Sequence, residues 1–178
     1  TTKIGFNKEQ VMVVDNTSMK TSVAEAFRNE VAKLSAVKSS SFAGFLPVEN
    51  SARNDNTWST EAVMKENNGF NMQNWRVDYN YIPTMGMELS KGRNFSAEFG
   101  GDSTALIINE AAAQLLGLAD PLNKKLYTTD REDNPISYTI VGVVKNFNYE
   151  SLRKNVGPLC LRLGNNRWAS AYRVSTTD

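Results

Sequence analysis

The 178-residue chain contains 20 basic and 19 acidic residues, so its formal net charge is +1. This balance does not favour a nucleic-acid-binding protein, which usually carries a basic excess to neutralise phosphates. The chain has no histidine and a single cysteine. Ser-His-Asp and Cys-His catalysis, histidine-ligated or four-thiolate zinc, and an internal disulfide are therefore excluded for this chain acting alone.

The first part of the chain predicts a strand, a helix and a second strand. Residues 10–16 form a β-branched run ending in Asp-Asn, which predicts a buried strand. A capping box and an apolar face then predict an amphipathic helix that packs this face into the core. The capping box is Ser22 with Glu25, and the apolar face is Val23, Phe27, Val31 and Leu34. The Ser-rich residues 35–47 predict a strand that pairs with the first one.

A hairpin is predicted after the polar loop at residues 49–56. Strand-like runs at 58–65 and 70–79 flank an Asn-Gly pair, which is typical of a tight turn because both residues tolerate positive φ. Trp58 and Trp75 fall on this hairpin. We expect them to pack in the core, although an aromatic binding surface is the alternative.

The remaining elements mix helices and strands without regular βαβ alternation. A short apolar-faced helix from Tyr81 is predicted to stop near Gly86, and a second helix is predicted to start at the cap Asn109 and end before Gly117. The helix from Tyr81 takes its apolar face from Tyr81, Ile82, Met85 and Leu89, and residues 91–93 predict a turn. Strands are predicted at 104–108, 126–129, 136–144, 158–163 and 171–174, with a charged turn at 130–135. The pattern predicts an α+β fold with a mixed sheet and two main helices.

Few residues suggest chemistry. Two Ser-x-x-Lys matches occur, Ser151 with Lys154 and Ser35 with Lys38, and this spacing can place an amine beside a nucleophilic hydroxyl. The companion motifs of penicillin-binding enzymes are missing, so chance is the better explanation.

Metal and cofactor signals are equally weak. The acidic turn at 130–134 alternates oxygen ligands but lacks the central Gly and distant Glu of an EF-hand loop, so a solvated turn is favoured. Residues 100–102, Gly-Gly-Asp, do not continue into a phosphate loop and predict a connector. Cys160 lies between leucines, which is typical of an inert buried thiol, and Glu110 suits a helix start without a catalytic role. We therefore predict no catalytic, cofactor or metal site.

Three segments of the chain form a recognisable set: YIPTMGMELSKGRNF at 81–95, IINEAAAQLLG at 107–117 followed by DPLNK at 120–124, and YTIVGVVKNFNYESL at 138–152. Together they resemble the extracytoplasmic domain of MacB-like, FtsX-like ABC transporter permeases. The opening residues 5–11 are also similar to the family. The chain departs from the family pattern at Asn123, where Gly is usual, and at Asn146 and Asn148, where Asp and His are usual.

The resemblance implies a domain without catalysis or cofactor, outside the bacterial inner membrane. It implies membrane helices at both ends, a cytoplasmic ABC ATPase, and an adaptor or second permease copy as further partners. It also implies a porter-like lobe at 1–97 with 165–178 and a smaller inserted lobe at 98–164. The chain lacks a signal peptide and an initiating Met, which fits an excised segment or a mature product of a longer protein. Both ends must then return to one membrane, so we expect Gly5 and Val174 on the same side of the fold.

Two other functions remain open from the sequence. One is a free-standing periplasmic or surface protein that binds a ligand with Trp58, Trp75, Tyr79 and Tyr81. The other is a hydrolase that uses Ser151 and Lys154, which requires the amine within hydrogen-bond reach of the hydroxyl.

Overall fold

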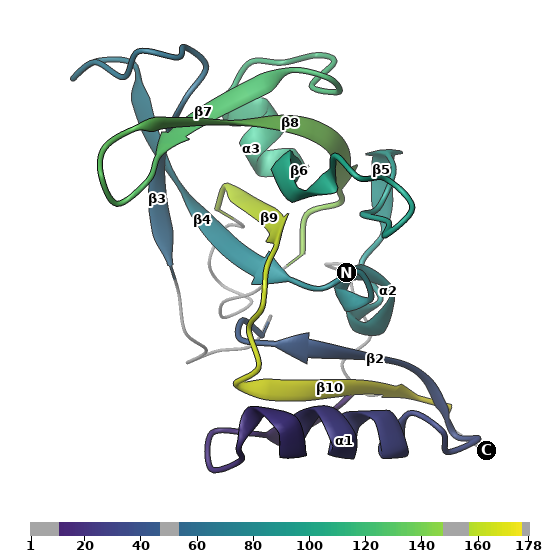
Figure 1. The fold of residues 1–178 in the computed structure, drawn as a ribbon. Coiled ribbons are helices and arrows are strands. Elements are labelled where there is room, and N and C mark those ends of the chain that lie inside the picture. Colours follow the sequence, from purple (N-terminus) through teal and green to yellow (C-terminus); the bar gives the residue numbers. More distant parts are fainter. Residues whose placement is uncertain (1–10, 47–53, 148–156, 176–178) are drawn as a thin grey trace.

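The computed structural model describes residues 11–46, 54–147 and 157–175. In this part of the chain, ten strands form one mixed sheet, in the order β1-β10-β2-β4-β3-β7-β8-β6-β9 with β5 attached to β8. Figure 1 shows two regions, a small layer with helices on both sides and a larger region where the sheet curls round. The α+β class and the mixed sheet predicted from the sequence are confirmed.

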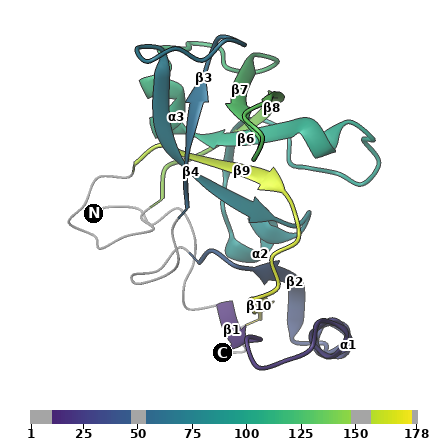
Figure 2. The same cartoon turned by 60° about the vertical axis from the view of Figure 1, so that its left-hand side comes forward.

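The small layer consists of three antiparallel strands. They are β1 (Val11–Asp15), β10 (Ala169–Val174) and β2 (Val37–Ala43), with β10 in the middle. Helix α1 (Thr21–Val31) lies on one side of this layer and the short α2 (Tyr81–Met85) on the other (Figure 1). Figure 2 shows α1 end-on, on the far side of the layer from the rest of the sheet.

The larger region is a closed ring of strand pairs. Its members are β4 (Gly69–Val77), β3 (Asp55–Ser59), β7 (Lys125–Thr129), β8 (Pro135–Val144), β6 (Ala105–Asn109) and β9 (Leu159–Leu163). The ring closes because β9 also pairs in parallel with β4. Strand β5 (Leu89–Gly92) pairs with β8, a 3₁₀ turn spans Asp102–Thr104, and α3 (Glu110–Leu115) follows β6. The ring joins the small layer where Ala43 of β2 pairs with Val77 of β4.

Alternating side chains divide the interior into two apolar clusters. All five residues of β6 are buried. Ala105 and Ile107 pack with Trp75 in one cluster, whereas Leu106 and Ile108 pack with Trp58 in the other. Successive strand residues point to opposite faces, so β6 is covered on both sides. It therefore forms a wall shared by both clusters.

Two predictions for the first elements are wrong. Strand β1 is an edge strand that pairs with β10 alone in the described sheet, and Met12 and Val13 are 48% and 44% exposed, so it is not buried. Strand β2 does not pair with β1, because β10 lies between them. The sequence could not show this insertion, since β10 comes from the far end of the chain.

The predicted face of α1 is also wrong. Val23, Phe27 and Leu34 are 52%, 38% and 59% exposed, and the residue that α1 buries is Ala24. The helix has the expected period, but a neighbouring face turns toward the sheet. Ser22 does not cap it either, since the N-cap is Lys20 and no side chain caps the helix.

The hairpin and the segment after α2 also differ in detail from the prediction. Strands β3 and β4 pair antiparallel as expected, but β3 ends at Ser59 and Gly69 lies inside β4, so a nine-residue connection replaces the Asn-Gly turn. Leu89 belongs to β5 rather than to a helix, and Gly92 ends that strand with φ 70° instead of standing in a turn. The predicted loop at 49–56 lies largely outside the described residues, and Asp55 and Asn56 are in β3.

The later elements confirm the sequence analysis. Helix α2 ends at Gly86, which has φ 65°. The Asn109 side chain accepts a hydrogen bond from the Ala112 backbone N–H at 3.0 Å and so caps α3, and Gly117 follows with φ 63°. The strands predicted at 104–108, 126–129, 136–144, 158–163 and 171–174 are all present within a few residues.

Candidate functional site

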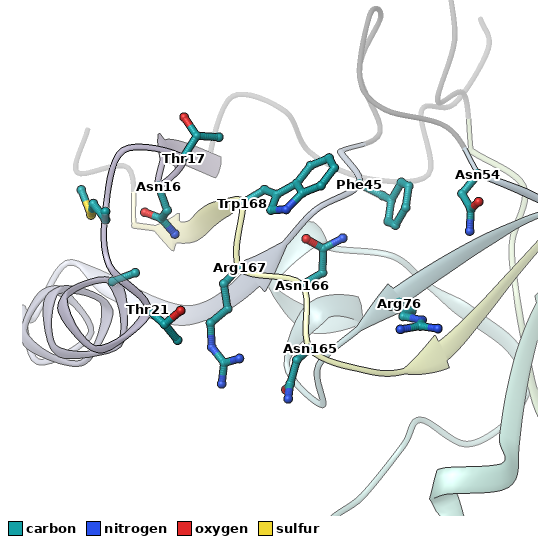
Figure 3. Close-up of a pocket in the computed structure, with 12 residues that line it drawn as sticks. Asn16, Thr17, Thr21, Phe45, Asn54, Arg76, Asn165, Asn166, Arg167 and Trp168 are labelled. Carbon is teal, nitrogen blue, oxygen red and sulfur yellow. The ribbon is translucent and has the colours of Figure 1, made fainter. Parts of the chain in front are cut away.

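An open hollow of about 470 Å³ lies beside the connection from β9 to β10. Figure 3 shows that its side chains come from three places: the β1–α1 connection with the start of α1, the connection at 165–168, and the region of β2 and β4 with Phe45, Asn54 and Arg76. These segments are far apart in sequence, and the strand order β1-β10-β2-β4 brings them together.

Two amide oxygens in the hollow lack hydrogen-bond partners in the described chain. Asn16 is 3% exposed, and its Nδ2 donates to Ser170 Oγ at 2.7 Å while its Oδ1 is unsatisfied. Asn166 Oδ1 is buried and equally unsatisfied. A Cβ added to Gly44 would lie 1.6 Å from the Asn166 amide nitrogen, so this amide lies directly on the Gly44 backbone. Buried polar atoms are normally paired, so these oxygens indicate a place for a donor.

The charges of the hollow are basic. Arg76 and Arg167 line it, and no Asp or Glu does among the described residues. Arg167 Nη2 lies 2.6 Å from Glu25 Oε1, whereas Arg76 is exposed and has no ion pair in the described ranges. The aliphatic part of the Arg76 side chain packs against Gly164. A Cβ added to Gly164 would lie 2.9–3.1 Å from the Arg76 side-chain carbons. Trp168 beside these residues is 62% exposed. Within the described ranges, the hollow therefore combines an arginine without an ion pair, unsatisfied acceptors and an aromatic surface.

Helix α1 is held near the hollow by ion pairs. Glu25 pairs with Arg167, and Arg28 lies 3.5 Å from Asp78. The Arg28 and Arg167 guanidinium carbons lie 4.3 Å and 5.5 Å from the centre of the Phe42 ring. Cation–ring contacts of this kind add to the ion pairs. Ion pairs and cation–ring contacts therefore help to attach α1 to the sheet.

The aromatic binding surface considered from the sequence is not present. Trp58, Trp75 and Tyr81 are each 0% exposed, and Trp58 belongs to a different cluster from the other two. Tyr79 is 42% exposed but has none of these three beside it at the surface. The expectation that both tryptophans pack in the core is confirmed.

The serine–lysine candidates do not form a site in the described chain. Ser35 lies in the turn after α1 and Lys38 in β2, and both are exposed, as expected for a chance match. Ser151 and Lys154 lie outside the described residues.

The remaining sequence candidates have structural roles. Asp130 Oδ1 accepts from the backbone N–H of Asn134 at 2.9 Å and of Glu132 at 2.8 Å, and these bonds lower the pKa of its carboxyl. Burial raises the pKa of the Cys160 thiol well above its ordinary value, which keeps it uncharged and unreactive. Glu110 Oε2 accepts from the Asn146 backbone N–H at 3.2 Å, which ties α3 to the segment after β8.

The buried charge of Asp102 was missed from the sequence. Asp102, treated there as part of a connector, has a side chain 2% exposed and receives both terminal nitrogens of Arg93, at 2.7 and 2.9 Å. This bond lowers the pKa of the Asp102 carboxyl.

The hollow beside residues 165–168 was also missed from the sequence. Its one signal is the polar run with a tryptophan at 165–168, which predicts only an exposed connection.

Among the described residues, no helix combines the length and the apolar character needed to cross a membrane. The same residues contain no cluster of three or more potential metal ligands.

Comparison with known proteins identifies the fold. The periplasmic region of MacB from Actinobacillus actinomycetemcomitans is similar over 98% of this chain and 78% of its own, with a TM-score of 0.60 and 13% identity. The extracellular domain of the noncanonic ABC-type transporter YknZ from Gram-positive bacteria is similar over 98% and 82%, with a TM-score of 0.55 and 14% identity. No curated protein sequence matches the chain. The model of the MacB-like periplasmic core domain matches residues 4–158, and the chain therefore belongs to this family.

Proposed function

We propose that the chain is the extracytoplasmic domain of an ABC transporter permease, which couples ATP hydrolysis in the cytoplasm to the handling of a partner or substrate outside the membrane. The observation that carries the proposal is the position of the two described ends. Val11, the first described residue, lies opposite Arg173 in the pairing of β1 with β10.

This pairing gives the domain two adjacent attachment points. In an antiparallel pair, residues directly opposite each other have Cα atoms about 4.5–5.5 Å apart. The chain therefore enters along β1 beside the place where it leaves along β10. Membrane helices that continue from both ends would pull on neighbouring strands, and a shift of one helix would act directly on β1, which is held by five residue pairs. Gly5 lies outside the described residues, so its position opposite Val174 stays a prediction.

The family supports the partners in this proposal. They are the flanking membrane helices of the same polypeptide, a cytoplasmic ABC ATPase, and a periplasmic adaptor or a second permease copy. The domain would then lie on the outer face of the bacterial inner membrane. The description of the family as a periplasmic core domain supports this location.

We also propose that two lobes move relative to each other, with residues 1–97 and 165–178 in one lobe and residues 98–164 in the other. Strand β10 supports this grouping, because its partners β1 and β2 both come from the first segment. Strands β6, β7 and β8 form an uninterrupted run of neighbours from the second segment. The β3–β4 hairpin and β5 would then link the lobes, since β3 pairs with β7, β4 with β9 and β5 with β8.

The proposed role involves no chemistry on this domain. The lack of histidine supports this, as it removes the commonest general base. A free-standing binding protein built on Trp58 and Trp75 is disfavoured, because both rings are fully buried.

The test uses the full-length permease with its ATPase in membranes. Val11→Cys and Arg173→Cys are introduced together, because facing residues in an antiparallel pair lie within the Cα separation that a disulfide needs, about 4.4–6.8 Å. If the ends must shift relative to each other, oxidation lowers the ATPase rate and a reductant restores it. Each single variant is the control. An ATPase rate that is unchanged by a verified disulfide would contradict the proposal.

The location is tested separately. Arg131→Cys, in the exposed turn after β7, is introduced into the same full-length protein with Cys160 left in place, because that thiol is buried. We expect a membrane-impermeant maleimide to label this variant in intact cells. Labelling that requires cell lysis would place the domain in the cytoplasm and contradict the proposal.

A further inference from the structure

We infer that the hollow between the β1–α1 connection, Arg76 and residues 165–168 is a binding site for a short peptide segment that carries a carboxylate. This inference goes beyond the transport role and does not depend on it, because it concerns binding by the purified chain. The chemistry follows from three groups that the fold leaves unmatched.

The first groups are the two unsatisfied acceptors. Asn16 Oδ1 and Asn166 Oδ1 are buried without a donor in the described chain. The Asn16 side chain cannot turn away without losing the bond from its Nδ2 to Ser170 Oγ, 2.7 Å long. The Asn166 amide lies against the Gly44 backbone. A ligand with N–H groups would satisfy both oxygens, and leaving them unmatched costs free energy.

The second group is the free cation. Arg76 is exposed at the edge of the hollow, has no ion pair in the described ranges, and is positioned by the contact of its stem with Gly164. Its guanidinium is a planar fork that binds carboxylates in a bidentate manner. The other arginine of the hollow, Arg167, already pairs with Glu25. A carboxylate that enters would therefore be attracted chiefly to Arg76.

The third group is Trp168. Its ring is 62% exposed and belongs to the same hollow (Figure 3). An exposed aromatic ring of this kind offers apolar contact to the Cα and side-chain carbons of a bound peptide.

Other ligand classes match fewer of these groups. A hydrogen phosphate ion offers an anion for Arg76 and one or two O–H donors, but no apolar carbon for Trp168. A neutral glycan offers hydroxyl donors but no anion for Arg76. A peptide with a carboxylate supplies N–H donors, an anion and apolar carbon together. The carboxylate can belong to an acidic side chain or to a free C-terminus, and the test separates the two.

The test measures binding to the purified 178-residue chain by titration calorimetry, with tryptophan fluorescence as a second readout. Trp58 and Trp75 are fully buried, so a fluorescence change on binding reports chiefly on Trp168. The probes are acetyl-Gly-Gly-Glu-amide, acetyl-Gly-Gly-Gly with a free carboxylate, the neutral acetyl-Gly-Gly-Gln-amide, chitotriose and inorganic phosphate.

We expect at least one carboxylate peptide to bind saturably. The affinity of the neutral peptide should be lower by a factor of about ten or more, which is the effect of losing one charge-assisted hydrogen bond. Arg76→Gln removes this preference, and Asn166→Ala weakens binding of the preferred peptide. Arg131→Gln, which removes a cation from an exposed turn, is the matched control and binds as the wild type does.

Several results would overturn the inference. They are the absence of saturable binding by both carboxylate peptides, binding of the neutral peptide as tight as that of the preferred carboxylate peptide, and unchanged affinity in Arg76→Gln. Chitotriose or phosphate binding as tightly as the peptides would assign the hollow to a glycan or to a simple anion instead.

Discussion

Arg28 of α1 lies 3.5 Å from Asp78, the residue that follows β4, and this pair connects the outermost helix to the centre of the sheet. Asp78 also accepts hydrogen bonds from Ser41 Oγ and the Phe42 backbone N–H of β2, both at 2.8 Å. A fourth bond comes from the Asn80 backbone N–H at 3.0 Å, directly before α2. One carboxylate therefore joins α1, β2 and α2 at the junction of the small layer with the ring.

Asp78→Asn should weaken this junction. Both carboxylate oxygens of Asp78 accept hydrogen bonds, so the NH₂ group of the asparagine amide must replace one acceptor and face a donor there. The negative charge that attracts Arg28 is also lost. We expect the free energy of unfolding to fall by about 1–3 kcal/mol, the cost of leaving a donor unmatched. Urea denaturation measures the change. Asp133→Asn, in an exposed turn where Asn tolerates the φ of 61°, is the control and should change stability by less than about 0.5 kcal/mol. Equal effects of the two variants would mean that Asp78 is not a junction.

Asp102 should make stability depend on pH. Arg93 and the Ser96 backbone N–H hold the pKa of the Asp102 carboxyl below its usual value. A folded-state pKa below the unfolded value of about 3.9 adds stability at higher pH, and this contribution is lost as pH falls through the lowered pKa. Asp102→Asn should thus be less stable than the wild type at pH 7, by about 1–3 kcal/mol. The difference should shrink on acidification. Urea midpoints from neutral to acidic pH measure it, and a difference independent of pH would be evidence against this role.

Gly142 should not tolerate a side chain. It lies in β8 between Gly92 of β5 and Ile107 of β6, and an added Cβ would approach the Arg93 carbonyl oxygen to 2.4 Å. The neighbour is backbone, so relief requires strand movement, and Gly142→Ala should cost about 1–3 kcal/mol or more. Gly101→Ala is the matched control, because nothing lies within 4 Å of its added Cβ. Thermal unfolding of both variants makes the comparison. Similar melting temperatures would show that β5 can move away from β8 at little cost.

Sequence reasoning succeeded where the rule is local. Asn109 caps α3 and Gly117 ends it because both rules concern a few neighbouring backbone groups. It failed for the packing of α1, because a periodic apolar face predicts a helix but does not show which side of the helix contacts the sheet. Contact with the sheet is made instead through Ala24 and the ion pairs of Glu25 and Arg28. It could not predict the hollow, since its residues meet only after β10 has paired between β1 and β2.

Gly44→Ala offers a test of the hollow that leaves its lining residues unchanged. The added Cβ would occupy the place of the Asn166 amide, which is the end of a flexible side chain, so we expect Asn166 to rotate away at a cost below about 1 kcal/mol. Binding of the carboxylate peptide should then weaken as much as in Asn166→Ala.

The double variant decides whether the two changes act on the same group. If Gly44→Ala acts only by displacing Asn166, the double variant binds the peptide as weakly as each single variant, because the second change removes a contact already lost. Titration calorimetry on all three variants measures this. Losses that add in the double variant would mean that Gly44 affects the hollow by another route. Wild-type affinity in Gly44→Ala would show that the position of the Asn166 amide over the Gly44 backbone does not matter for binding.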